Sequence, residues 1–125
     1  MSEGSGAAQR VLVVEDSMII ALDAEECLLS LGAEEVVVVD TVAGALSALA
    51  NQKFDFAVLD FNLGNESSDG IAAELRNRDI PFWLATGYSE LTGGLEALGA
   101  RGVLVKPYGR AELAEVMSEF ASLRD

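Results

Sequence analysis

The sequence predicts a doubly wound α/β domain, in which helices cover both faces of a parallel sheet. Three features carry this expectation: five short apolar runs rich in β-branched and aromatic residues, segments of helical period between them, and short connections throughout. The runs are continuous, as expected of strands that are buried on both faces. A chain of 125 residues fits one such domain.

Strands and helices are expected to alternate along the whole chain. The five strands are predicted over residues 10–15, 34–39, 55–60, 80–86 and 101–105, and the five helices over 17–31, 41–51, 68–77, 89–98 and 109–123. The first helix begins at the capping residue Ser17 and ends at Gly32. Right-handed crossovers between the parallel strands then place helices on both faces of the sheet.

Two segments are expected to be less ordered than the rest. Residues 1–9 are small and polar, so we expect a loose tail there, with the domain occupying residues 10–125. The segment 89–98 carries Gly93 and Gly94 in its middle. This pair costs about 2 kcal/mol of helix stability relative to alanine, so we expect a short, frayed or mobile helix.

Charge and composition exclude several classes of function. The chain has 8 Lys and Arg residues against 21 Asp and Glu residues, a net charge of −13 that repels nucleic acids and anionic membranes. Its apolar stretches are far shorter than the roughly 20 residues that span a bilayer, and its N-terminus lacks a basic-then-apolar signal pattern. The single Cys27 and the absence of histidine exclude disulfide frameworks, Cys/His zinc sites and histidine bases. We therefore expect a cytoplasmic protein without nucleic-acid or membrane contacts.

Polar residues at the carboxyl ends of the predicted strands form the candidate site, because ligands of such sheets bind beyond those ends. They are Glu15 and Asp16 at the end of the first strand, Asp60 in the third, Thr86 in the fourth and Lys106 after the fifth. Three carboxylates packed together repel one another unless protons or a cation neutralise them. Mg²⁺ suits this open rim, because it prefers a few carboxylate oxygens and keeps several waters.

With the cation bound, one carboxylate stays available as a nucleophile toward phosphorus and can form an aspartyl phosphate. Asp60 is the candidate, because it is the lone acid on the central strand. Phosphoryl transfer depends on neutralising the equatorial oxygens, and Mg²⁺, the Lys106 ammonium and the Thr86 hydroxyl can each take one.

Each of these residues also has an ordinary structural explanation. Asp16 could cap a helix, Asp60 could occupy a turn, and Lys106 could begin a loop. Taken singly, such explanations are favoured about two to one. Their convergence on one sheet edge in the right strand order is much harder to obtain by chance.

The sequence resembles the receiver domain of two-component response regulators over residues 10–123. The matching motifs are VLVVED in the first strand, AVLDFNL in the third, DG followed by AAELR in the third helix, LATG in the fourth strand and VLVKP in the fifth. The resemblance implies a flavodoxin-like sheet of order 2-1-3-4-5 and a cis peptide bond between Lys106 and Pro107.

The resemblance also implies the chemistry and the partners. Asp60 would be phosphorylated, and Mg²⁺ would be held by Asp16, Asp60 and the backbone carbonyl of Asn62, with Glu15 assisting. The phosphodonor would be a phosphohistidine on a sensor histidine kinase or a histidine phosphotransfer protein. The receiver would catalyse only this transfer to itself, so we expect no metabolic enzyme.

Two departures from the usual receiver affect its signalling. Val103 stands where most receivers carry a switch aromatic, whereas Tyr88 directly follows Thr86 and Gly87. This LATGY arrangement is similar to the FATGUY subgroup, so Thr86 and Tyr88 are the expected switch residues. We expect no output module, so a single-domain receiver would act by binding an unidentified downstream protein, or by shuttling or draining phosphate.

Three other functions compete with the receiver interpretation. A receiver-like interaction module that works without phosphorylation fits the altered switch, but the intact acid set argues against it. A cofactor or nucleotide enzyme would need a glycine-rich phosphate loop, and the first turn, EDSMII, has none. A phosphatase that uses Asp60 would need a second acid two residues later, and the residue at that position is Asn62.

Overall fold

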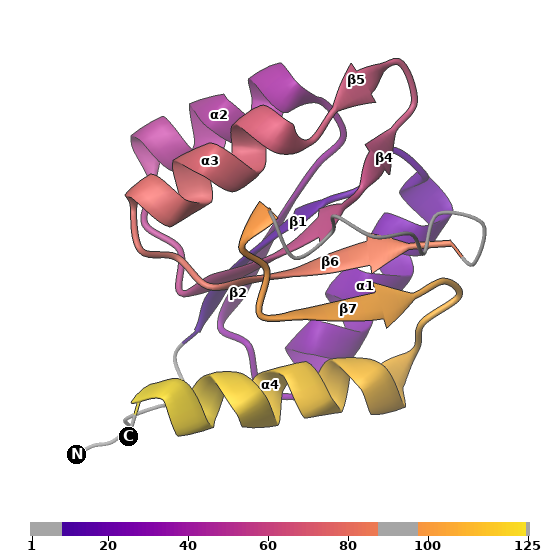
Figure 1. The fold of residues 1–125 in the computed structure, drawn as a ribbon. Helices are drawn as coiled ribbons and strands as arrows, with labels where there is room; N and C mark the ends of the chain where they lie inside the picture. The colour runs from indigo at the N-terminus through magenta and orange to yellow at the C-terminus, as the bar shows by residue number, and fades with distance from the viewer. Residues whose placement is uncertain (1–8, 88–97, 125) are drawn as a thin grey trace.

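A five-stranded sheet in the order β2-β1-β3-β6-β7 forms the centre of the molecule (Figure 1). The structure, a computed structural model, describes residues 9–87 and 98–124. The strands are β1 (Arg10–Val14), β2 (Glu35–Val39), β3 (Phe56–Asp60), β6 (Phe82–Thr86) and β7 (Gly102–Val105), and all neighbours are parallel. In chain order these are the first to fifth strands of the sheet, so the predicted order 2-1-3-4-5 is confirmed.

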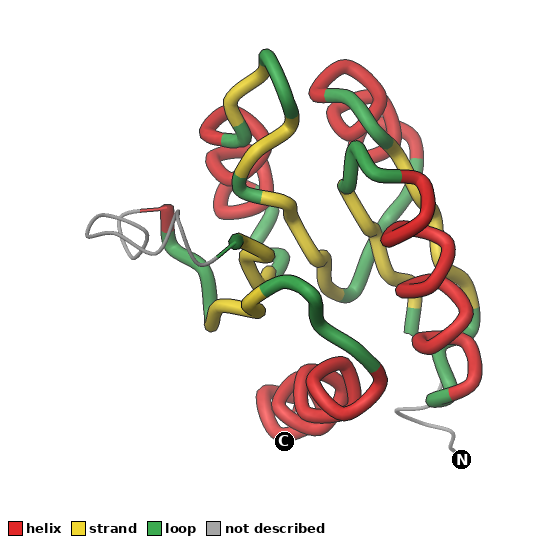
Figure 2. The backbone as a smooth tube through the Cα atoms, turned by 90° about the vertical axis from the view of Figure 1, so that its right-hand side faces the viewer, coloured by secondary structure: helices red, strands yellow, loops and turns green. Residues whose placement is uncertain are grey.

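Helices cover both faces of this sheet (Figures 1 and 2). The described helices are α1 (Met18–Ser30) and α4 (Arg110–Arg124) on one face, and α2 (Val42–Asn51) and α3 (Asp69–Asn77) on the other. Strand β1 serves both layers, because successive side chains point to opposite faces. Val11 and Val13 pack under α1 and α4, whereas Leu12 and Val14 pack under α2 and α3.

The predicted starts of the first two helices are confirmed, and each start has a side-chain cap. The Ser17 hydroxyl accepts a hydrogen bond from the Ile20 N–H at 3.5 Å, and the Thr41 hydroxyl accepts one from the Gly44 N–H at 2.9 Å. After α1, Gly32 adopts a φ of 112°, which a residue with a Cβ rarely does. Apart from Leu98, the predicted helix over 89–98 lies outside the described residues, as do residues 1–8 of the predicted tail.

The segment between β3 and α3 contains a hairpin that was not predicted. Strands β4 (Asn62–Leu63) and β5 (Glu66–Ser67) are antiparallel and form a separate two-stranded sheet. Strands of two residues are too short to give a periodic sequence signal. The one local sign is Gly64 in the turn, with a φ of 72°. The hairpin extends directly from the end of β3, where the candidate acids gather.

No helix within residues 9–87 and 98–124 is both long and apolar enough to cross a membrane.

Candidate functional site

The acids predicted from the strand ends come together at one edge of the sheet. One carboxylate oxygen from each of Glu15, Asp16 and Asp60 lies within 4.8 Å of the others. Glu15 and Asp60 are each only 1% exposed, whereas Asp16 is exposed at the rim. The site therefore has a buried pair of carboxylates and a third carboxylate that faces solvent.

Lys106 bridges the two buried carboxylates. Its ammonium nitrogen lies 2.9 Å from Asp60 Oδ2 and 3.2 Å from Glu15 Oε2. The lysine directly follows β7, and its backbone N–H donates to the Thr86 carbonyl at 2.8 Å. The next peptide bond, to Pro107, is cis, as the resemblance implies. The fifth strand of the sheet thus delivers its cation to the carboxylate of the central strand.

Burial and charge shift the acid–base behaviour of all three groups. Burial, followed by the neighbouring Asp60, raises the pKa of Glu15 from 4.5 to about 7, although Lys106 opposes this shift. Burial likewise raises the pKa of Asp60, and the hydrogen bond from Lys106 offsets only part of the effect. Burial lowers the pKa of Lys106, but its contacts with Asp60 and Glu15 outweigh that and raise it. One ammonium group therefore does not fully neutralise the two buried carboxyls.

The donor set fits a hard divalent cation such as Mg²⁺. Glu15 Oε2 accepts hydrogen bonds from Lys106 and from the Ser17 N–H at 3.2 Å. Its other oxygen, Oε1, is buried and has no hydrogen-bond partner in the described part of the chain. A buried acceptor without a partner is costly, and a cation would satisfy it. All three acidic residues offer oxygen ligands, which Mg²⁺ prefers.

The β4–β5 hairpin begins inside this site. The Asn62 N–H donates to Asp60 Oδ1 at 3.1 Å, and the Asn62 side chain accepts from the Gly64 N–H at 3.0 Å. A Cβ at Gly64 would stand 3.6 Å from Asp16 Oδ2, so the turn lies against the exposed acid. Asn62, predicted as a ligand through its backbone, is thus held next to Asp60, while the turn that follows it lies next to Asp16.

Thr86 ends β6 at the same edge and is fully buried. Its hydroxyl donates to the Gly87 carbonyl at 3.4 Å, a long hydrogen bond. The predicted second switch residue, Tyr88, lies outside the described residues. Val103, the residue at the usual switch position, is 43% exposed on β7.

Sequence reasoning missed two features beside the acids. Tyr108 is 7% exposed, and its hydroxyl has no hydrogen-bond partner among the described residues. Burial, and then the charges of Glu15 and Asp60, raise the pKa of Tyr108. The first turns of α1 also expose Met18, Ile19 and Leu22, by 48%, 84% and 53%. For the buried Tyr108, the one sequence signal was its position after Lys106–Pro107. For the exposed turn of α1, it was the excess of apolar residues in that helix.

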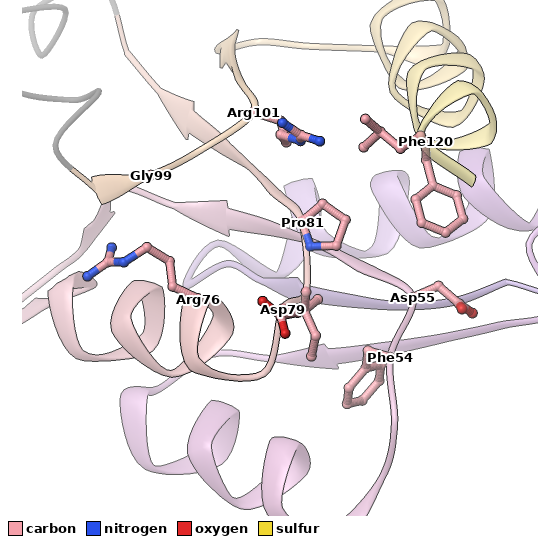
Figure 3. A pocket seen from close by; sticks show the side chains of 10 residues that line it. Phe54, Asp55, Arg76, Asp79, Pro81, Gly99, Arg101 and Phe120 are labelled. Atoms are coloured by element: carbon pink, nitrogen blue, oxygen red, sulfur yellow. The ribbon is translucent and has the colours of Figure 1, made fainter. Parts of the chain in front are cut away.

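A hollow of about 690 Å³ lies far from these acids, at the amino-terminal edge of the sheet (Figure 3). Its charged residues are balanced, with Arg76 and Arg101 against Asp55 and Asp79. Asp55 accepts a hydrogen bond from the Arg10 N–H at 2.7 Å, and Arg76 donates to the Leu98 carbonyl. These groups serve local structure, so the acid cluster is the better candidate site.

Comparison with known proteins decides the family. Residues 11–118 match the family described as the response regulator receiver domain. The chain belongs to the response regulator receiver family. This confirms the family predicted from the strand motifs, whereas membership of the FATGUY subgroup stays a prediction.

The receiver is similar to one part of a longer curated protein. It is 31% identical over 118 residues to the response regulator protein FleR of Pseudomonas aeruginosa. That match covers 91% of this chain and 25% of FleR, so the receiver spans about a quarter of the length of that relative.

Solved receiver structures share the fold over nearly the whole chain. SdrG from Sphingomonas melonis Fr1 is 37% identical, with a TM-score of 0.77, and the match covers 97% of this chain and 99% of SdrG. The receiver domain of the sensor histidine kinase PA1611 from Pseudomonas aeruginosa PAO1 is 26% identical, with a TM-score of 0.80. The match covers 92% of this chain and 98% of the PA1611 domain. The PA1611 structure has a magnesium ion coordinated in its active-site cleft.

Proposed function

We propose that this receiver accepts a phosphoryl group on Asp60 in a two-component phosphorelay. One observation carries the proposal: the Asp60 carboxylate ends the central strand, 1% exposed, with the Lys106 ammonium 2.9 Å away and two further acids beside it. A carboxylate in such a cluster has both a nucleophilic oxygen and cations to neutralise the group that it receives.

Glu15, Asp16, Asp60 and the backbone of Asn62 would hold Mg²⁺. When bound, the ion supplies positive charge beside the phosphoryl oxygens. The orphaned Oε1 of Glu15 and the all-oxygen donor set support this assignment. The magnesium ion in the PA1611 receiver domain supports it from a relative.

In the transfer, a carboxylate oxygen of Asp60 forms a bond to phosphorus while the bond from phosphorus to the donor's imidazole nitrogen breaks. The bonding electrons leave with that nitrogen. Asn62 keeps Asp60 oriented through its N–H to Oδ1. Lys106 is placed to exchange its contact with Asp60 for one with a phosphoryl oxygen, and Thr86 is the hydroxyl donor at the same edge. The receiver thereby catalyses its own modification and no metabolic reaction.

The donor would be a sensor histidine kinase or a histidine phosphotransfer protein. The chain contains no histidine, so it is suited to receive the group from such a protein. The exposed apolar turn of α1, made of Met18, Ile19 and Leu22, begins three residues after Glu15 and offers a docking surface beside the site. The phosphorylated receiver would then bind a downstream protein or pass its phosphate on.

The direct test uses acetyl phosphate and the intact mass of the protein. In the presence of Mg²⁺ the wild-type receiver should gain the mass of one phosphoryl group, and excess EDTA should prevent the gain. Protein that stays unlabelled with Mg²⁺, although it is folded and binds the ion, would contradict the proposal. That result would favour a receiver that works through protein contacts without phosphorylation.

A further inference from the structure

The Leu63–Glu66 pair of the β4–β5 hairpin contacts the rest of the molecule in two ways. The register pairs Leu63 with Glu66, so both side chains leave the hairpin on the same face. Leu63 is 4% exposed and packs in the core beneath α2 and α3. Glu66 is exposed, and its Oε1 accepts a hydrogen bond from the Val42 N–H at 3.0 Å. One attachment is therefore apolar, and the other is a single hydrogen bond.

The partner of Glu66 is the N-terminus of α2. The first N–H groups of a helix lack intrahelical acceptors, and a carboxylate is favoured there by the helix dipole. At this N-terminus, the N-cap residue Thr41 already accepts a hydrogen bond from the Gly44 N–H at 2.9 Å. Glu66 takes the Val42 N–H from 24 residues further along the chain. It thereby ties the hairpin to the helix that follows β2.

The hairpin also contacts the acids, through Asn62 at its start and Gly64 in its turn. Asn62 donates to Asp60 at 3.1 Å, and Gly64 lies against the Asp16 carboxylate. The end of β2 is tied to the site as well, because the Val39 carbonyl accepts from the Glu15 N–H at 3.0 Å. Hydrogen bonds therefore connect the acids to the end of β2 and to the start of the hairpin. The hydrogen bond of Glu66 closes this set of contacts, because it joins the hairpin to the N-terminus of α2, which follows β2.

We propose that Glu66 is a positioning residue for the cation site of this receiver. By fastening the hairpin to α2, it fixes where Asn62 and Gly64 stand relative to Asp60 and Asp16, although Glu66 itself is not a ligand. The inference rests on the proposed function, because it assumes that the acids bind Mg²⁺. Outer contacts that orient metal ligands commonly contribute tenfold or more to affinity.

The test measures Mg²⁺ affinity by isothermal titration calorimetry, with no phosphodonor present. Glu66→Ala should weaken binding about tenfold. Glu66→Gln keeps an oxygen acceptor for the Val42 N–H while losing the charge, so its affinity should stay within about threefold of wild type. Thr41→Ala removes a different cap from the same helix and should also stay within about threefold. Amide hydrogen exchange of residues 62–67 should speed up in Glu66→Ala alone.

The controls separate the ways in which the inference can fail. Equal losses in Glu66→Ala and Glu66→Gln would assign the effect to charge, and equal losses in Glu66→Ala and Thr41→Ala would assign it to fraying of α2. Either result, or unchanged affinity in Glu66→Ala, overturns the positioning role while leaving the proposed function in place. Wild-type protein that binds no Mg²⁺ would overturn both.

Discussion

Lys106 Nζ lies 2.9 Å from Asp60 Oδ2, so the cation of the last strand and the carboxylate of the central strand form an ion pair. The same ammonium is 3.2 Å from Glu15 Oε2. This shared contact gives Lys106 two tasks in the proposed reaction. It holds the buried carboxylates in the resting receiver, and it is available to the phosphoryl oxygens afterwards.

The first prediction separates the roles of Asp16 and Lys106. Asp16→Ala should weaken Mg²⁺ binding by about tenfold or more, because it removes a ligand. Lys106→Ala should leave Mg²⁺ affinity largely intact and slow labelling by acetyl phosphate, because it removes a cation from the phosphoryl oxygens. Calorimetry and the rate of labelling measure the two effects separately. Equal losses of Mg²⁺ affinity in both variants would contradict this division.

Because removing a repelling charge can stabilise the metal-free protein, the two variants need a stability control. Thermal unfolding in EDTA should show Asp16→Ala folded and at least as stable as wild type. Lys106→Ala should be less stable, because Glu15 and Asp60 are left buried without their cation.

The second prediction concerns the pH dependence of stability without Mg²⁺. The folded-state pKa of Glu15 is raised from 4.5 to about 7, so the folded protein binds more protons than the unfolded chain between these values. Glu15 therefore lowers the free energy of unfolding as pH rises through this window. Asp60, whose pKa is also raised, acts in the same direction. Urea unfolding in EDTA at several pH values measures the slope.

Glu15→Gln is the matched control for this slope, because the amide still offers an oxygen to the Ser17 N–H and to Lys106. The decline in stability between pH 4.5 and 7 should be smaller in Glu15→Gln than in wild type. Identical slopes in the two proteins would show that Glu15 does not titrate in this range.

The third prediction addresses the buried phenol of Tyr108. Its hydroxyl has no hydrogen-bond partner among the described residues, and burying such a group costs free energy. Tyr108→Phe keeps the ring in the core and should raise the free energy of unfolding by about 1 kcal/mol. Chemical denaturation checks the sign. A loss of stability would show that the hydroxyl is hydrogen-bonded in solution.

The strands and the acid cluster could be predicted from sequence because both depend on local patterns. Continuous apolar runs mark strands covered on both faces, and the ends of parallel strands meet at one edge of the sheet. Asp60 and Lys106 therefore could be placed together although they are 46 positions apart. Ser17 signalled the start of the first helix through its own side chain.

The missed features depend on contacts between distant segments. The hairpin of two-residue strands is held by the burial of Leu63 and by the bond from Val42 to Glu66, and neither leaves a local pattern. In α1, Ala21, Ala24 and Leu28 are buried while larger apolar residues stay outside. Periodicity alone does not say which of two apolar faces a neighbour covers.

The measurement that tests the role of Asp60 most directly is intact-mass analysis after incubation with acetyl phosphate and Mg²⁺. Asp55→Asn is the matched control, since Asp55 directly precedes β3, at the end opposite Asp60, and its carboxylate accepts a hydrogen bond from the Arg10 N–H. Wild type and Asp55→Asn should each gain one phosphoryl group, and Asp60→Asn should gain none. Asp60→Asn that is labelled to the same extent as wild type would contradict the assignment of Asp60 as the acceptor.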